Sequence, residues 1–137
     1  MNSSIRNLLA LIIGGFVGSV LRYQIGEWMP SPTNGFPWST LLINLGGCLF
    51  LGWFLTLTLL SLTIRPEIRL GFGTGMTGSF TTFSTFSVQS VHLFRIGDAD
   101  NAFIYIGISA LGGLLFSFLG VALARVQSRK RKGGLSL

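Results

Sequence analysis

Three long stretches of this chain contain no Asp, Glu, Lys or Arg: residues 28–64, 70–94 and 101–124. Each stretch holds the ~20 residues that a helix needs to cross a bilayer. A shorter apolar run, 8–21, precedes them and is followed by Arg22. Only 10% of all residues are charged, against roughly 25% in soluble domains. The fold class predicted from these runs is an all-α integral membrane protein with four transmembrane helices.

Turn-forming sequence separates the four predicted spans, which we place at about 7–29, 38–62, 69–95 and 101–125. The first break is the proline-rich segment 30–37, the second is an Arg-Pro-Glu triplet, and the third is the Gly-Asp segment 97–101. All three breaks are short, so neighbouring helices are antiparallel and residues 1–137 form a single four-helix membrane domain. Asp100 or Asn101 is expected to cap the last helix, because its side-chain oxygen can accept a free backbone N–H.

Basic residues are divided unequally between the two sides of the membrane. With four spans, both termini and the loop between the second and third spans share one side. That side carries eight Lys and Arg residues, and the other carries only Arg22 and Arg95. The positive-inside rule then places the termini in the cytoplasm, as expected for a multi-pass protein of the inner (plasma) membrane. The basic cluster 125–132 favours an orientation signal or contact with anionic lipid over nucleic-acid binding.

The uncharged stretch 70–94, the third predicted span, is a poor helix. Residues 71–87 read G-F-G-T-G-M-T-G-S-F-T-T-F-S-T-F-S, with four glycines and with phenylalanines among hydroxyl side chains. Lipid tolerates irregular backbone only where protein or a cavity receives its polar groups. The sequence therefore predicts that the third span is interrupted, and that the interruption marks a binding site or a pathway.

The polar side chains within the spans are neutral hydrogen-bond donors, and no carboxylate lies at the midpoint of any span. A proton-coupled exporter of cations would need such a carboxylate, whereas donors without carboxylates suit an anion. Any single Ser or Thr more commonly bonds to its own helix, so the argument depends on their clustering. Cys48 is the only cysteine, which excludes an intrachain disulfide, and no catalytic constellation suggests an enzyme. The donors are Asn44, Ser79, Thr81, Thr82, Ser84, Thr85, Ser87, Tyr105 and Ser109.

Phenylalanine recurs every three residues at Phe80, Phe83 and Phe86, which places the rings on one face if the backbone there is helical. Such a stripe ordinarily serves packing. A second interpretation is that the electropositive ring edges face a small anion. Spacing alone leaves both interpretations open.

Glycines at small-xxx-small spacing, Gly14 with Gly18 and Gly71 with Gly75, predict that helices approach one another closely. Four such helices alone enclose very little space. A pathway would more naturally lie between subunits, so close self-association is expected, with a dimer as the simplest form.

These motifs carry a family resemblance. The string T-F-S-T-F-S at 82–87 preceded by Gly78, the segment T-L-L-I-N at 40–44, and Arg22 in the first span resemble the CrcB or Fluc family of fluoride channels over essentially the whole chain. The resemblance implies a channel that exports cytoplasmic fluoride by passive permeation and protects against fluoride toxicity. It also implies a dual-topology, antiparallel dimer with two pores.

The resemblance also implies roles for individual residues. The two pore phenylalanines of the family fall on Phe83 and Phe86 rather than on Phe80. Where some relatives carry another serine one turn after Ser109, this chain has Gly113, and whether Ser117 substitutes is open. The expected fluoride pathway comprises Thr40, Asn44, Phe83, Ser84, Thr85, Phe86, Tyr105, Ser109 and Arg22.

A sodium ion at the dimer centre is a further implication of the resemblance. Its ligands would be the backbone carbonyls of Gly78 and Thr81 from each subunit. A broken helix frees carbonyls, and a hard cation prefers oxygen ligands. Such an ion would be structural and would not be transported.

Two questions stay open at this level. The charge bias of eight to two fits poorly with a chain that inserts both ways, so the dimer is either an antiparallel homodimer or a pair with a homologous, oppositely oriented subunit. The alternative function is a small multidrug-resistance-type cation exporter, which the absence of a central carboxylate in the first span disfavours. A membrane protein with a purely structural role is a third reading. Fluoride efflux from liposomes separates all three.

Overall fold

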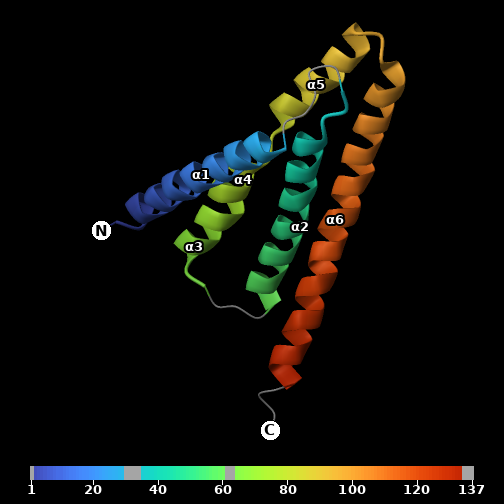
Figure 1. The fold of residues 1–137 in the computed structure, drawn as a ribbon. Helices are drawn as coiled ribbons and strands as arrows, with labels where there is room; N and C mark the ends of the chain where they lie inside the picture. Colours follow the sequence, from blue (N-terminus) through green and yellow to red (C-terminus); the bar gives the residue numbers. More distant parts are fainter. Residues whose placement is uncertain (1, 30–34, 61–63, 134–137) are drawn as a thin grey trace.

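The computed structural model describes residues 2–29, 35–60 and 64–133, and within these ranges the chain forms helices and no strands (Figure 1). Three helices are long, and a series of short helical pieces lies between the second and the third of them. In order, the elements are α1 (Ser3–Trp28), α2 (Trp38–Leu60), α3 (Pro66–Leu70), the π-helical segment η1 (Gly71–Met76), α4 (Thr77–Phe80), α5 (Phe83–Arg95) and α6 (Ala99–Gly133).

Among the described residues, α1, α2 and α6 are each long and apolar enough to cross a membrane. The prediction of an all-α multi-pass membrane protein is therefore confirmed. The third predicted span, 69–95, is built from α3 to α5, and its crossing of the bilayer stays a prediction, as do the boundaries of all four spans. Helix α6 continues beyond the predicted end of the fourth span to Gly133, because the uncharged run marks the membrane and not the end of the helix.

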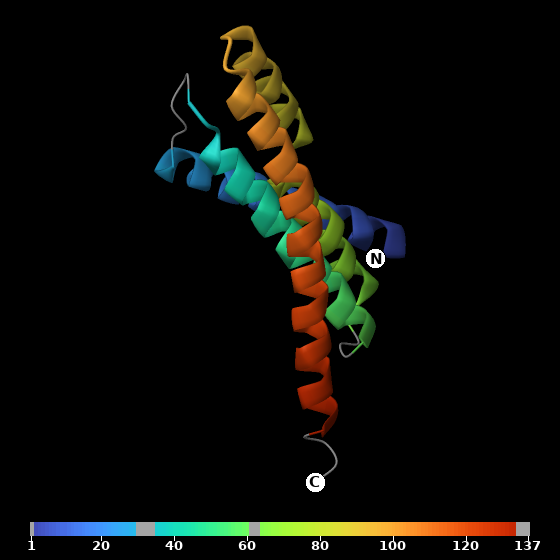
Figure 2. The same cartoon turned by 90° about the vertical axis from the view of Figure 1, so that its right-hand side faces the viewer.

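Helices α2 and α6 lie side by side along most of α2, and the C-terminal end of α6 extends beyond the other helices (Figure 2). Glycine allows this close approach. A Cβ atom at Gly52 would collide with the carbonyl oxygen of Ser117, and one at Gly120 would collide with that of Leu49. Near the other end of the pair, a buried cluster joins α5 to it; its members are Leu41, Leu45, Leu93, Ala102 and Tyr105.

Helix α1 packs against η1 and α4 through a second set of glycines. A Cβ atom at Gly14 would collide with the carbonyl oxygen of Gly71, and one at Gly18 with that of Met76. A Cβ atom at Gly75 would lie 2.9 Å from the carbonyl oxygen of Leu11. The close approach predicted from glycine spacing is confirmed, and these particular glycines achieve it within one chain.

The turn between α5 and α6 differs from the prediction in one detail. Gly97 has a positive φ of 82°, a conformation that favours glycine. Asp98 then caps α6: its Oδ1 accepts from the backbone N–H of Asn101 at 3.4 Å, and its Oδ2 accepts from the Asn101 side-chain amide at 2.9 Å. The predicted caps, Asp100 and Asn101, are wrong because the helix begins at Ala99, ahead of both.

Candidate functional site

Between α4 and α5 the backbone is extended at two residues. Thr81 has φ and ψ of −77° and 158°, and Thr82 has −147° and 116°. Asn44 of α2 pairs with both backbone polar groups of Thr82: its Nδ2 donates to the Thr82 carbonyl oxygen at 3.1 Å, and its Oδ1 accepts from the Thr82 N–H at 2.8 Å. One side chain, 38 residues away, thus satisfies backbone groups that would be costly to leave unpaired away from water.

The Thr82 side chain begins α5 as its N-cap. Its Oγ1 accepts from the backbone N–H of Thr85 at 3.2 Å and donates to the Thr85 hydroxyl at 3.0 Å. The Ser84 hydroxyl lies 3.2 Å from the same oxygen. Threonine is a favoured capping residue because its hydroxyl accepts from a free N–H in the first turn. The hydroxyl groups of Thr82, Ser84 and Thr85 therefore meet at the start of α5.

These side-chain bonds release two carbonyl groups from helical bonding. In a continuous helix the Gly78 carbonyl would accept from the Thr82 N–H, and the Thr81 carbonyl from the Thr85 N–H. Both N–H groups donate instead to side chains, those of Asn44 and Thr82. Gly78 is exposed, and a Cβ atom there would meet nothing within 4 Å. Two backbone oxygens near the break are thus free of the bonds that a continuous helix would give them.

An aromatic row continues from the start of α5 toward α6. The ring centroids of Phe83 and Phe86 are 5.7 Å apart, and those of Phe86 and Tyr105 are 5.2 Å apart. Phe83 is 79% exposed. Phe80 ends α4 and lies before the extended residues, so the backbone between it and Phe83 is not helical. The structure therefore brings Phe83 and Phe86 together and separates Phe80 from them.

Polar groups accompany this row on α2, α5 and α6. The buried Tyr105 hydroxyl donates to Gln89 Oε1 at 3.0 Å, and the side chain of Thr40 also hydrogen-bonds to Tyr105. One turn further along α6, the Ser109 hydroxyl oxygen is buried with no hydrogen-bond partner among the described residues. Sequence reasoning did not single out Gln89. The feature that could have identified it is an amide side chain within the uncharged stretch 70–94.

A cavity of about 270 Å³ lies at the break itself, with walls from α2, α4, α6, the two extended residues and the start of α5. Ser117 is one of its lining residues, whereas a Cβ atom at Gly113 would touch the sulfur of Cys48. Both polar and apolar side chains contribute to the wall. It is lined by Asn44, Gly47, Cys48, Leu51, Thr77, Thr81, Thr82, Phe83 and Ser117.

Three other predicted pathway residues, Ser84, Thr85 and Arg22, lie at or near the surface of the single chain. Ser84 and Thr85 are exposed at the start of α5. Arg22 is partly exposed near the end of α1, and within the described ranges no hydrogen bond or ion pair joins it to Asn44 or to the phenylalanines. The role of each of these residues toward an ion stays a prediction.

The fold and the site define a small, all-helical, multi-pass membrane protein with a break rich in hydroxyl groups and flanked by phenylalanine. The family model described as "CrcB-like protein, Camphor Resistance (CrcB)" matches residues 9–121. The chain belongs to the CrcB family, which confirms the resemblance seen in the sequence.

Curated relatives agree with this membership. The chain is 47% identical over 119 residues to a protein of Moorella thermoacetica named fluoride-specific ion channel FluC 1, covering 86% of this chain and 85% of the relative. It is 44% identical over 119 residues to fluoride-specific ion channel FluC of Oceanobacillus iheyensis, covering 87% and 92%. It is 39% identical over 127 residues to the protein of the same name from a Synechococcus species, covering 92% and 98%.

Proposed function

We propose that this protein is a fluoride channel of the inner membrane, which lets cytoplasmic fluoride leave by passive permeation and so protects against its toxicity. The observation that carries the proposal is the similarity, over most of the chain, to relatives named for fluoride conduction. The protein is a channel and not an enzyme. The family match favours this function over the multidrug exporter considered from the sequence.

Fluoride follows the row of rings and neutral donors, from Phe83 and Phe86 toward Tyr105 and Ser109. Ring edges are electropositive, and the buried, unpartnered hydroxyl of Ser109 can donate to an anion. Asn44 uses one amide hydrogen on Thr82, which leaves its second hydrogen to donate to the ion. Thr40, Ser84 and Thr85 add hydroxyl groups, and Arg22 attracts the anion toward the pathway.

The functional unit is an antiparallel dimer in which the third span, 69–95, crosses the membrane with an interruption at the break. Two observations support this arrangement. The elements α3 to α5 together cover the length of a span, and Phe83 is largely exposed on the single chain, so a second subunit is needed to enclose a path beside it. The partner is a second copy or a homologous subunit inserted the other way.

A sodium ion binds where the two breaks meet, through the carbonyl oxygens of Gly78 and Thr81 from each subunit. The loss of helical bonding at these two carbonyls and the exposure of Gly78 support this role, because a hard cation takes oxygen ligands. No group of three or more His, Cys, Asp and Glu side chains suited to a metal occurs in the described part of the chain. The ion stabilises the dimer and does not move through it.

The test is efflux of fluoride, compared with chloride, from liposomes that contain the purified protein. Phe83→Ile and Phe86→Ile keep an apolar side chain and remove the ring edge. We expect fluoride efflux to fall at least about tenfold in each variant, which corresponds to about 1.4 kcal/mol in the barrier, while the dimer still purifies. Phe118→Ile, which changes an exposed ring of α6, is the matched control and should leave efflux unchanged. Efflux of chloride equal to that of fluoride would reject the proposed function.

The choice between a homodimer and a paired subunit has its own test. If the basic tail determines insertion, most chains insert with both termini in the cytoplasm, and the protein alone protects few cells. Neutralising Arg129, Lys130, Arg131 and Lys132 leaves four basic residues against two and should give mixed insertion and restored growth in fluoride. A C-terminal topology reporter measures the mixture. Even insertion and full protection by the unmodified chain would establish the homodimer.

A further inference from the structure

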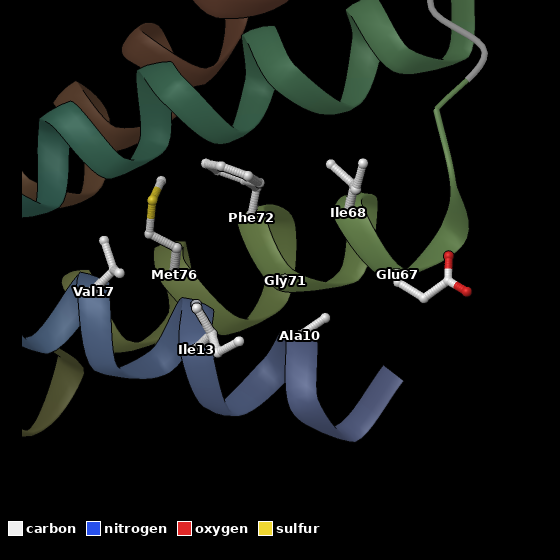
Figure 3. Close-up of a pocket in the computed structure, with 9 residues that line it drawn as sticks. Ala10, Ile13, Val17, Glu67, Ile68, Gly71, Phe72 and Met76 are labelled. Atoms are coloured by element: carbon white, nitrogen blue, oxygen red, sulfur yellow. The ribbon is translucent and has the colours of Figure 1, made fainter. Parts of the chain in front are cut away.

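An apolar groove of about 240 Å³ lies between α1 and the segment formed by α3 and η1 (Figure 3). It shares no lining residue with the cavity at the break. Ala10, Ile13 and Val17 of α1 form one wall, and Ile68, Phe72 and Met76 form the other. The groove therefore runs along α1, away from the proposed fluoride pathway.

The two helices approach so closely at the floor of the groove that only glycine fits there. Gly14 meets the carbonyl of Gly71, and Ala10 lies beside the same residue. The groove above this contact is open to its surroundings, and Ile13 in its wall is 62% exposed. At membrane depth an open apolar surface of this kind contacts either lipid chains or another protein.

One end of the groove carries an ion pair. Arg6 lies one turn before Ala10 on the same face of α1, and its Nε donates to Glu67 Oε1 at 2.8 Å. The Arg6 side chain is 48% exposed and that of Glu67 only 16%. Figure 3 places Glu67 at the end of the groove nearest Ala10, with Val17 and Met76 at the other end.

The ion pair is incomplete on both sides. Glu67 Oε2 is buried and has no hydrogen-bond partner among the described residues. A buried carboxylate oxygen without a donor is unfavourable. The described contact of Arg6 uses Nε, while a guanidinium carries further N–H donors on its two Nη atoms. The end of the groove thus places guanidinium donors, which suit a phosphate, beside a carboxylate, which suits an ammonium group.

We propose that this groove binds one phospholipid of the phosphatidylethanolamine type. An acyl chain lies along the groove between α1 and η1, the phosphate accepts from the Arg6 guanidinium, and the primary ammonium donates to the Glu67 carboxylate. The argument for this lipid is charge complementarity, because the headgroup is a zwitterion and the Arg6–Glu67 pair presents the opposite charges. A choline headgroup has no N–H to donate, and a glycerol headgroup has no cation. The proposal depends on the membrane location of α1 and not on fluoride conduction.

Native mass spectrometry of the purified, assembled protein tests this proposal. The protein is incubated with equal amounts of phosphatidylethanolamine, phosphatidylglycerol and phosphatidylcholine that have the same acyl chains. We expect phosphatidylethanolamine to be retained most. Arg6→Gln and Glu67→Gln should each lower its retention about tenfold, as the loss of a hydrogen bond to a charged group predicts. Arg69→Gln makes the same charge change as Arg6→Gln at an exposed residue outside the groove lining and should retain the lipid.

A third variant keeps the test decisive if the charge variants fail to assemble. Ile13→Trp fills the groove without altering the ion pair and should also abolish retention. Equal retention of the three lipids, or unchanged retention in the three variants, overturns the proposal. So does a disulfide between copies at Ile13→Cys in a Cys48→Ala background, since it would make the groove a contact between subunits. Fluoride efflux is measured in parallel: a chain that retains the lipid but conducts no fluoride contradicts only the proposed function.

Discussion

The chain contains two helix assemblies: a regular one formed by α2 and α6, and an irregular one formed by α1 and the segment from α3 to α5. Both pack closely through glycine residues. The α2–α6 pair consists of two continuous helices in contact through Gly52 and Gly120, and the contact of α1 with η1 and α4 depends on Gly14 and Gly18. The backbone of α2 and α6 is satisfied within each helix. The segment from α3 to α5 instead includes a π-helical turn and two extended residues, and the backbone groups of one of them, Thr82, bond to the Asn44 side chain. Close glycine packing therefore occurs both in the regular assembly and in the irregular one. In the irregular assembly, the backbone at the break also depends on an individual polar side chain, that of Asn44.

The largest expected effect tests the glycine contact that supports the irregular assembly. Gly14→Val should prevent α1 from packing on η1, because even a Cβ atom there collides with a backbone carbonyl. We expect a loss of stability at or above the upper end of the ~1–3 kcal/mol typical of overpacking. Gly15→Val is the matched control, since a Cβ atom at Gly15 meets nothing within 4 Å. The measurement is the yield of monodisperse protein and its thermal unfolding. Equal behaviour of the two variants would show that α1 does not depend on this contact.

A second, smaller effect should follow from the pairing of Asn44 with Thr82. Asn44→Asp keeps the shape of the side chain and can still accept from the Thr82 N–H, but it no longer donates to the Thr82 carbonyl or to an anion. We expect a destabilisation of about 1–3 kcal/mol, the cost of a buried group without its partner, together with a strong loss of fluoride efflux.

The matched control for Asn44 lies on the same helix. The Thr58 hydroxyl donates to the Leu55 carbonyl within α2 at 2.9 Å, so Thr58→Val should change stability and efflux little. Efflux is measured at neutral pH with the introduced acid shown to be ionised. Normal efflux in Asn44→Asp would remove Asn44 from the pathway, and normal thermal unfolding would remove it from the support of the break.

The smallest expected effect concerns the regular assembly. Trp53 Nε1 of α2 donates to Gln127 Oε1 of α6 at 2.9 Å, and this bond is exposed. Trp53→Phe removes it and keeps an aromatic ring, so we expect a loss of only about 0.5 kcal/mol and normal fluoride efflux. Thermal unfolding and efflux of the same preparation give both quantities. A large loss of efflux would contradict the separation between the helix pair and the site.

The regular assembly could be predicted from the sequence more fully than the irregular one. Uncharged runs locate α1, α2 and α6 because a bilayer requires long apolar helices. They do not locate the end of α6, since Arg, Lys and Gln are good helix formers and extend the helix to Gly133. Glycine spacing predicted close helix contacts, but only the structure shows which glycines meet.

At the site, the composition of residues 71–87 predicted an irregularity without its position. The extended backbone falls at Thr81 and Thr82 because Asn44, distant in the sequence, pairs with Thr82. A local pattern cannot contain that contact. For the same reason the sequence placed Phe80 in line with Phe83 and Phe86 on the assumption of a helix, and it missed Gln89, whose partner Tyr105 lies on another helix.

The pairing of Asn44 with Thr82 also constrains the order of events as the chain enters the bilayer. Asn44 is synthesised first, 38 residues ahead of Thr82, so α2 can be in place before the second partner arrives. In hydrocarbon, an extended Thr82 without Asn44 would leave an N–H and a C=O unpaired, whereas a continuous helix would pair both. We therefore expect the segment to enter as a helix and to open at Thr81 and Thr82 when it meets α2. On that expectation, the irregular shape of the site is formed during assembly in the membrane and not before it.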